Sequence, residues 1–464
     1  MPSDNKHVQE YIQAICKEIR FKGVRKTIAA ELTDHIEDQK NVYMGQGLDE
    51  DTASLKAVEQ MGDPVLVGRQ LDKAHRPKTD GWMLALAALV VLMGGAVQFF
   101  LSGVNAKSAY LFSDFLVYGP VGIAACIFVY FFDYTLLERY SKLAYSLLLA
   151  ATAAGFFFFN MVNGAYRHVY YFMLLFIPAY TGIIYTFRNR GYLGIIASGL
   201  FYAAAAALCL YAGSVTSLFF LTVCCLAVLT VAILKGFFRC SRKAALAIVY
   251  IPVAILLLFV LLVILSQSPG RLSIMLHPEL DPMGAGWQHL LAKRLFAASQ
   301  PFGEASFTDM AGMSIDSFLP GWTTDFSLAY LFARLGYVPG FIIVTVVFVL
   351  IVRMFIAVMR QKNAYGFLLS FSACLAISMQ AALFVLSNTG VISPVSAIMP
   401  FVSFGSAGFI ANMILLGLVL SVYRRTDLVR DRLQGGPDRQ DRKRWFTLED
   451  GKLIIDLGGS ILKK

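Results

Sequence analysis

Asp325 is the ionisable side chain whose position most clearly suggests chemistry. It ends a polar insert spanning residues 267–325, within Thr323-Thr324-Asp325-Phe326, where a long hydrophobic run begins. A carboxylate at the edge of a membrane is costly, so we expect an acid kept there to have a use. A positioned carboxylate can accept the proton of an attacking hydroxyl group, which typically accelerates a reaction about 10²–10⁴-fold. The alternative is structural, since Asp ahead of an apolar run also suits a helix N-cap.

The rest of the polar insert offers further charged candidates. Its basic residues are Arg271, Lys293 and Arg294, and its acidic residues are Glu279, Asp281, Glu304, Asp309, Asp316 and Asp325. Glu279 and Asp281 lie beside prolines, where a carboxylate either fixes a turn or holds an ion or a sugar. The basic residues either meet phosphate groups or lie at the level of the lipid headgroups. The excess of acid favours a cation site or acid–base chemistry.

The elements that must position these residues are membrane-spanning helices. The chain is 57% hydrophobic and 15% charged, with a mean hydropathy of +0.63, which is far from a soluble composition. Ten runs are long enough to cross a hydrocarbon core of about 30 Å. They are 82–103, 115–135, 144–163, 170–187, 192–212, 216–236, 244–266, 326–352, 365–387 and 399–423. We therefore predict an all-α polytopic membrane protein.

The distribution of Lys and Arg predicts how these spans are oriented. Basic residues cluster in the short loops that follow even-numbered spans, whereas the short loops on the other side hold little beyond Lys107 and Arg167. By the positive-inside rule, both termini are cytoplasmic and the 267–325 loop is extracytoplasmic. The formal net charge of +10 is mainly this topology signal, so it does not indicate nucleic-acid binding.

The seven cysteines exclude two other kinds of site. Five lie within hydrophobic runs, none lies in the 267–325 loop, and no two are spaced as C-x-x-C. The pattern supports neither a disulfide framework nor a zinc site.

Two soluble segments flank the predicted membrane domain, which covers residues 81–425. Residues 1–80 show helical periodicity, with apolar stripes at 8–19, 28–36 and 53–61 and breaks at Gly23 and at Gly45. Asp63-Pro64 then suits the N-cap and first position of a fourth helix. This small helical domain resembles the prefix domains of some Gram-positive membrane proteins. Residues 426–464 form a basic cytoplasmic tail with a predicted short strand at 452–457.

Two separated motifs carry a resemblance to a known family. The first runs from Pro278-Glu279-Leu280-Asp281-Pro282 and Trp287-Gln288 to Thr323-Thr324-Asp325-Phe326, ahead of the eighth predicted span. The second comprises Asn388-Thr389-Gly390 and Met399-Pro400-Phe401-Val402-Ser403-Phe404-Gly405, ahead of the last span. Their order and placement resemble the SEDS family of shape, elongation, division and sporulation proteins, which includes RodA, FtsW and SpoVE.

The resemblance implies a peptidoglycan glycosyltransferase that polymerises lipid II in elongation, division or sporulation. A class B penicillin-binding protein would be its partner, in the bacterial plasma membrane. Asp325 matches the acid held to be catalytic in the family, and Arg167 matches an arginine in a Gly-x-x-Arg stretch. Direct displacement assisted by one base would invert the anomeric centre, and the leaving diphosphate needs positive charge from the protein or from Mg²⁺ or Mn²⁺. The expected substrate-binding residues are Arg167, Arg271, Glu279, Asp281, Gln288, Lys293, Arg294, Thr324 and Ser403.

Departures from the family pattern keep other functions open. The family's Gln-Pro-Ser-Glu element and the following Lys are missing, because the segment 171–180 keeps only Pro178. Its Pro-Asp-Leu-Gly-Thr element is also absent from 210–216. The chain is thus a divergent relative, and the alternatives are a flippase for a lipid-linked sugar and a non-catalytic scaffold or sensor of cell-wall synthesis.

Overall fold

We describe the protein from a computed structural model. The described residues are 6–74, 77, 79–162, 164–267, 270, 273–274, 277–284, 286–305, 315–393, 395, 397–426, 446–449 and 452–455. Arg271 and Asp309 therefore lie outside the described residues.

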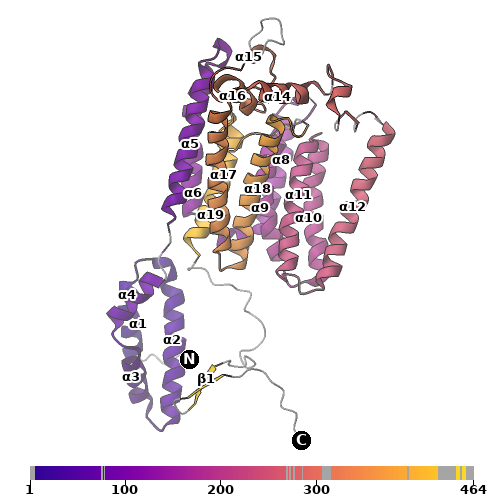
Figure 1. The fold of residues 1–464 in the computed structure, drawn as a ribbon. Helices are drawn as coiled ribbons and strands as arrows, with labels where there is room; N and C mark the ends of the chain where they lie inside the picture. Colours follow the sequence, from indigo (N-terminus) through magenta and orange to yellow (C-terminus); the bar gives the residue numbers. More distant parts are fainter. Residues whose placement is uncertain are drawn as a thin grey trace. The chain divides into compact units, whose positions relative to one another are not determined.

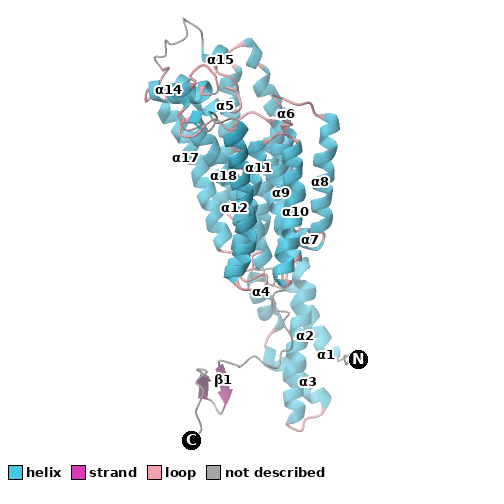
Figure 2. Ribbon diagram, turned by 90° about the vertical axis from the view of Figure 1, so that its right-hand side faces the viewer, coloured by secondary structure: helices cyan, strands magenta, loops and turns pink. Residues whose placement is uncertain are grey.

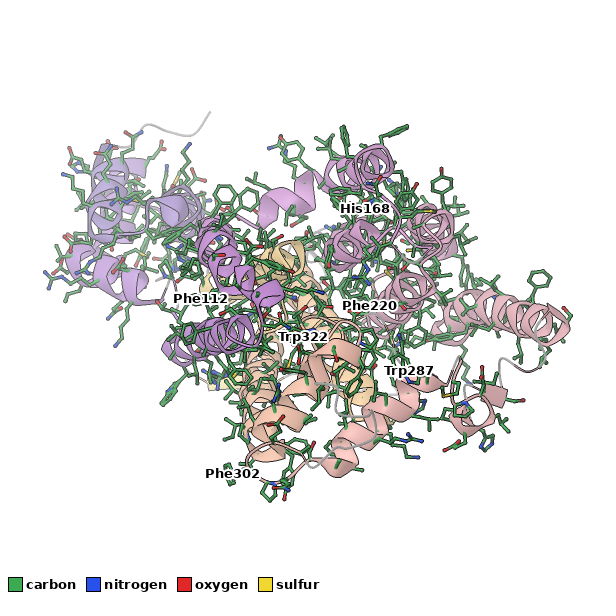
Figure 3. All side chains as sticks on the ribbon, turned by 90° about the horizontal axis from the view of Figure 1, so that it is seen from above. Phe112, His168, Phe220, Trp287, Phe302 and Trp322 are labelled. Atoms are coloured by element: carbon green, nitrogen blue, oxygen red, sulfur yellow. The ribbon has the colours of Figure 1, made fainter. Side chains whose placement is uncertain are left out.

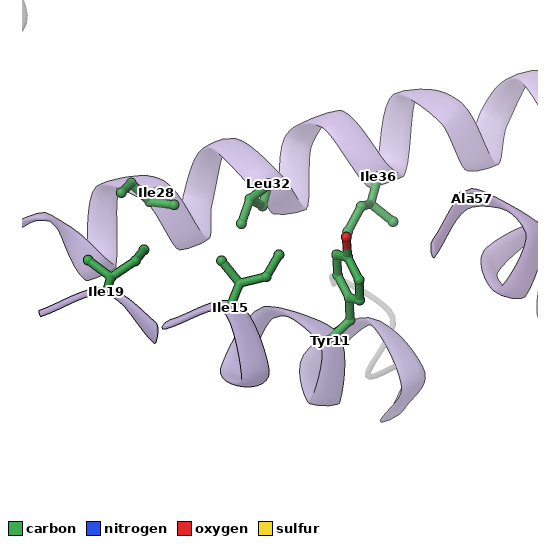
Figure 4. Close-up of a cluster of buried hydrophobic side chains, with 7 residues drawn as sticks. All are labelled: Tyr11, Ile15, Ile19, Ile28, Leu32, Ile36 and Ala57. Carbon is green, nitrogen blue, oxygen red and sulfur yellow. The ribbon is translucent and has the colours of Figure 1, made fainter. Parts of the chain in front are cut away.

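The N-terminal segment contains four helices: α1 (Lys6–Glu18), α2 (Lys22–Gly45), α3 (Glu50–Met61) and α4 (Pro64–Ala74). Their shared core comprises Tyr11, Ile15, Ile19, Ile28, Leu32, Ile36 and Ala57 (Figure 4). The predicted break between the first two helices is present, but it lies at residues 19–21 rather than at Gly23, because α1 ends at Glu18 and α2 begins at Lys22. Leu55, which the predicted apolar stripe at 53–61 includes, is 43% exposed and lies outside this core. As expected, Asp63 stands before α4, where its carboxylate accepts a bond from the Val65 N–H at 2.9 Å.

Ten helices in the described chain are long and apolar enough to cross a membrane, which confirms the predicted number. Their axes run side by side, with the connections at the two ends of the bundle (Figures 1 and 2). They are α5 (Gly81–Ser102), α6 (Tyr110–Phe131), α8 (Ser141–Phe158), α9 (His168–Thr186), α10 (Gly191–Tyr211), α11 (Val215–Leu234), α12 (Arg242–Gln267), α17 (Tyr337–Met359), α18 (Ala364–Asn388) and α19 (Ser406–Arg424).

Short elements connect the spans. They are η1 (Ala106–Ser108), α7 (Thr135–Arg139), η2 (Pro278–Leu280), α14 (Trp287–Ala298), α15 (Ile315–Phe318) and α16 (Ser327–Leu335). Helices α14, α15 and α16 lie together at one end of the bundle (Figure 1). In the tail, β1 (Phe446–Glu449) pairs antiparallel with β2 (Lys452–Ile455), which corresponds to the predicted strand.

Helices α9, α18 and α19 are the most buried spans, whereas α12 is the least buried. The central helices contact one another, and α9 also packs against α8, α10 and α11. Helix α12 stands at the periphery of the bundle (Figure 1). The three central spans therefore form the scaffold on which the ends of the neighbouring helices are placed.

The predicted eighth span, 326–352, is wrong as a single helix. The structure divides it into the short, buried α16 and the spanning α17. Gly336 separates them with φ 97°, and a Cβ there would lie 2.6 Å from the Pro301 carbonyl oxygen. The following N–H groups, of Tyr337 and Val338, donate to the carbonyls of Gln300 and Pro301 at 2.9 and 3.1 Å. This turn keeps α16, and the acid that precedes it, at the end of the bundle.

Candidate functional site

Asp325 occupies a tight turn that leads into α16. The turn begins at Gly321, where φ is 63°, and the Gly321 carbonyl accepts the N–H groups of Thr324 and Phe326, each at 2.9 Å. Trp322 lies in the same turn, near the middle of this end of the bundle (Figure 3), and its ring centroid is 4.7 Å from that of Tyr330. The backbone around Asp325 is therefore held within the turn itself.

Asn388, at the end of α18, clamps this turn from the side. Its Nδ2 donates to the Asp325 carbonyl oxygen at 2.9 Å, and its Oδ1 accepts the Ala329 N–H at 2.9 Å. The side chain is fully buried. Since a buried amide left without its partners is costly, these bonds fix the Asp325 backbone relative to α18. The sequence placed Asn388 in the second motif but did not predict this contact.

The Asp325 carboxylate faces Arg167. Arg167 Nη2 lies 3.8 Å from Asp325 Oδ2, and the two side chains are 44% and 22% exposed, respectively. Burial raises the pKa of the Asp325 carboxyl above its usual range, and the Arg167 charge acts against that rise. The N-cap alternative for Asp325 is not what the structure has, because Phe326 is the N-cap residue of α16 and no side chain caps the helix.

Asp325 and Arg167 line a cavity of about 270 Å³ at the end of the bundle. Its walls come from the α8–α9 connection, the start of α9, the α10–α11 connection and the segment before α19. The lining residues are Val162, Ala165, Arg167, Tyr170, Tyr171, Gly213, Ser214, Val215, Thr216, Asp325 and Ile398. Tyr166 N–H donates to the Ala212 carbonyl at 3.0 Å, which joins the two connections. The sequence analysis did not predict the contribution of Ser214 and Thr216.

Residues of the second motif contact the Asp325 turn and the start of α16. Ser403 Oγ lies 3.0 Å from Ser327 Oγ and also accepts the Met399 N–H at 3.0 Å. Phe404 N–H donates to the Thr323 carbonyl at 3.3 Å. Because Ser403 is only 4% exposed and does not line the cavity, its position suits support of the turn. Thr324 has a similar place, since its carbonyl accepts the Ser327 hydroxyl at 3.1 Å.

The other predicted residues that the structure describes lie in η2, in the turn after it and in α14, and none of them lines the cavity. Glu279 pairs with Lys293 at 3.9 Å, and Gln288 and Arg294 are exposed. Asp281 belongs to a turn in which its carbonyl accepts the Gly284 and Gly286 N–H groups at 3.4 and 3.1 Å. These positions fit the turn-forming and surface alternatives for the first motif, and binding by these residues stays a prediction.

His289 has a role that the sequence analysis missed. Its Nε2 lies 2.9 Å from the Gly390 carbonyl oxygen, which ties α14 to the end of α18. A Cβ at Gly390 would lie 2.8 Å from the Lys293 backbone, so the two segments approach closely.

The side chains that line the cavity do not by themselves form a metal site. Asp325 is the one acidic side chain among its described lining residues, and the described chain holds no group of three or more His, Cys, Asp or Glu side chains placed to bind a metal. A divalent cation would need further ligands, such as phosphate oxygens brought by a substrate.

Comparisons with known proteins agree with this architecture. The sequence model of the FtsW, RodA and SpoVE family, described as a cell cycle protein, matches residues 80–428. The probable peptidoglycan glycosyltransferase FtsW of Trichlorobacter lovleyi is 26% identical over 152 residues, which are 33% of this chain and 39% of the relative. The peptidoglycan glycosyltransferase MrdB of Escherichia coli K12 is 26% identical over 153 residues, 33% of this chain and 41% of the relative. The chain thus matches about two fifths of the length of these relatives.

A solved chain from a peptidoglycan synthase complex that coordinates polymerization and crosslinking has a similar fold. The TM-score is 0.59 at 18% identity, over 75% of this chain and 98% of the solved one. The likeness thus covers most of this chain rather than a single motif.

Proposed function

Because the chain belongs to the FtsW/RodA/SpoVE family, we propose that it is a peptidoglycan glycosyltransferase that polymerises lipid II into glycan strands. The observation that carries the proposal is the Arg167–Asp325 pair in a polar cavity at the end of the bundle. A lipid-linked sugar would bring its diphosphate to the same level, next to the membrane surface. The activities named for the curated relatives support this assignment.

Asp325 would act as the general base. The acceptor's 4-hydroxyl attacks the anomeric carbon of the donor, and its proton passes to the Asp325 carboxylate. A new C–O bond forms as the bond from the anomeric carbon to the diphosphate oxygen breaks, so undecaprenyl diphosphate leaves with the electron pair. Attack from the opposite face inverts the anomeric centre. A carboxylate whose pKa burial raises is a stronger base than an exposed one.

Arg167 would contact both the diphosphate of the donor and the Asp325 carboxylate. Its guanidinium has five N–H donors, so it can hold a phosphate oxygen while it remains close to Asp325. As a diphosphate drew Arg167 toward itself, Asp325 would lose part of its stabilising partner and gain basicity. A divalent cation bound to the diphosphate would add charge stabilisation to the leaving group.

The proposal also covers the partner protein and the orientation in the membrane. A class B penicillin-binding protein would crosslink the strands, and the solved relative's place in a synthase complex supports such a partner. The Lys and Arg distribution supports placing both termini in the cytoplasm and the cavity outside the plasma membrane of a bacterium.

The test uses the purified full-length protein with labelled lipid II, alone and with a class B penicillin-binding protein, with and without EDTA. We expect a ladder of glycan chains on a gel, and loss of the ladder with EDTA would support the bound cation. Movement of labelled lipid II across liposomes without any polymer would favour the flippase instead. If neither polymer nor movement occurred with any partner, the scaffold alternative would replace this proposal.

A further inference from the structure

Three basic side chains gather around two aromatic rings at the end of the bundle opposite the cavity. Lys142 Nζ and Arg190 Cζ lie 5.2 and 5.3 Å from the centroid of the same ring, that of Phe187. Arg188 Cζ lies 3.8 Å from the ring centroid of Tyr185. Such distances are within the range of cation–π attraction, about 6 Å. We call Lys142, Phe187, Arg188 and Arg190 the α8–α10 basic cluster.

The backbone that carries this cluster is fixed. Asn189 and Gly191 have φ values of 65° and 57°, and the Asn189 N–H donates to the Phe237 carbonyl at 2.8 Å. Arg188 Nη1 donates to the Tyr185 carbonyl at 3.1 Å. The turn between α9 and α10 is thus braced against the α11–α12 connection, and the basic side chains start from defined positions.

The charge of the cluster is not neutralised within the described residues. Among the described residues, no carboxylate forms an ion pair with Lys142, Arg188 or Arg190. Lys142 and Arg190 also share one aromatic ring, that of Phe187. Phe187 is only 8% exposed, whereas the two cations above it are exposed to the surroundings. Two positive charges that share one ring and have no carboxylate partner attract an anion, and an anion bound beside them offsets their charge.

The position along the helices identifies the anion. Helix α8 begins at Ser141, α9 ends at Thr186 and α10 begins at Gly191, so the cluster lies where three spans meet the headgroup layer. Basic side chains with aromatic neighbours are typical of that layer, and its abundant anions are lipid phosphates. Guanidinium and ammonium groups together can satisfy several oxygens of one phosphodiester.

We propose that the α8–α10 basic cluster is a binding site for an anionic phospholipid, whose phosphate Lys142 and Arg190 bind. The ligand is a bulk membrane lipid rather than the sugar-bearing substrate, and the site lies at the other end of the bundle from Asp325. The proposal therefore goes beyond the proposed function and does not depend on it.

The test is native mass spectrometry of the full-length protein released from detergent with phosphatidylglycerol or phosphatidylcholine of the same acyl chains. The variant is the pair Lys142→Gln and Arg190→Gln. The matched control is the pair Lys235→Gln and Arg424→Gln, which removes two cations that do not share an aromatic ring: Lys235 lies 3.5 Å from the Phe367 ring centroid and Arg424 4.5 Å from that of Phe131. The single variant Arg190→Gln changes one exposed side chain, so it still tests the proposal if the double variant does not fold.

We expect the wild-type protein to retain phosphatidylglycerol in preference to phosphatidylcholine. The Lys142/Arg190 pair should lower that retention on the order of tenfold, and Arg190→Gln should lower it less. The control pair should retain the lipid. Equal retention of phosphatidylglycerol by the wild type, the Lys142/Arg190 pair and Arg190→Gln would overturn the proposal. An equal loss in the control pair would also overturn it, because it would indicate non-specific attraction of the lipid to all basic residues at this end. No sugar substrate is present, so the result is separate from that of the polymerisation test.

Discussion

Two acid–base pairs in this protein have almost the same length but different surroundings. Arg167 and Asp325 lie 3.8 Å apart, with the carboxylate side chain 22% exposed. Lys293 and Glu279 lie 3.9 Å apart, and both side chains are about 60% exposed. The first pair lines a cavity walled by two connections and α9, whereas the second lies on the outside of α14 and η2.

The difference shows that burial, rather than pairing, sets the Asp325 carboxylate apart from Glu279. Solvent screens an exposed pair, so it contributes little to stability or to reactivity. In the cavity, burial opposes ionisation of Asp325 while Arg167 favours it. The pKa of Asp325 is therefore sensitive to whatever binds Arg167.

The largest effect in the comparison, apart from loss of the acid itself, should come from Arg167→Gln. The variant lacks the guanidinium proposed to bind the diphosphate, so turnover should fall about 10²-fold or more. The Arg167 charge lowers the pKa of Asp325, so its removal raises that pKa further. Because the base must be ionised, the fall in rate on acidification should begin at a higher pH in the variant. The measurement is a pH–rate profile of glycan synthesis.

Lys107→Gln is the control for this change, since it removes a positive charge from the same end of the bundle outside the cavity. An unshifted acid limb in Arg167→Gln would contradict the electrostatic coupling of Arg167 with Asp325.

A second change, Asn388→Leu, tests the contacts by which Asn388 holds the Asp325 turn. It removes the bonds to the Asp325 carbonyl and to the Ala329 N–H. Each buried group left unsatisfied costs about 1–3 kcal/mol, and we expect turnover to fall about tenfold as the carboxylate loses its position. Melting temperature and glycan synthesis are measured together. Thr389→Val is the neighbouring control, because within the described residues that hydroxyl bonds only the carbonyls of Val385 and Leu386 in α18.

A third change, Gly336→Ala, acts on the break that sets α16 apart from α17. Its φ of 97° and the 2.6 Å approach of a Cβ to the Pro301 carbonyl oxygen make alanine strained. We expect the free energy of unfolding to fall by about 1–3 kcal/mol. Gly199→Ala, at a helical glycine with nothing within 4 Å of the added Cβ, should be neutral or slightly stabilising. Equal melting temperatures for the two variants would show that the break tolerates a side chain.

The smallest effect belongs to the exposed pair. Glu279→Gln should change the free energy of unfolding by less than about 0.5 kcal/mol and leave turnover within roughly twofold of the wild type. Calorimetry and the glycan assay check both values. A large loss of turnover would show that Glu279 contacts substrate, as the family resemblance implies, and that the two pairs do not differ in function.

The sequence predicted the spans well because each is a continuous apolar run, but it could not divide 326–352. Hydrophobicity continues through Gly336, and the break depends on backbone contacts with Gln300 and Pro301, which no local pattern reveals. Asp325 was found because it stands at the edge of an apolar run. Asn388 was missed as its clamp because its partners, Asp325 and Ala329, lie 63 and 59 residues away in the chain. Arg167 was expected to bind phosphate, and its pairing with Asp325 emerged only from the fold.

The most direct test of the account is turnover of Asp325→Asn. Asparagine keeps the size of the side chain but cannot accept the proton, so glycan synthesis should fall about 10²-fold or more, while the melting temperature and binding of labelled lipid II stay near those of the wild type. Asp114→Asn, which changes an exposed carboxylate outside the cavity, should leave synthesis unchanged. Near-normal glycan synthesis by Asp325→Asn would contradict the assignment of Asp325 as the base.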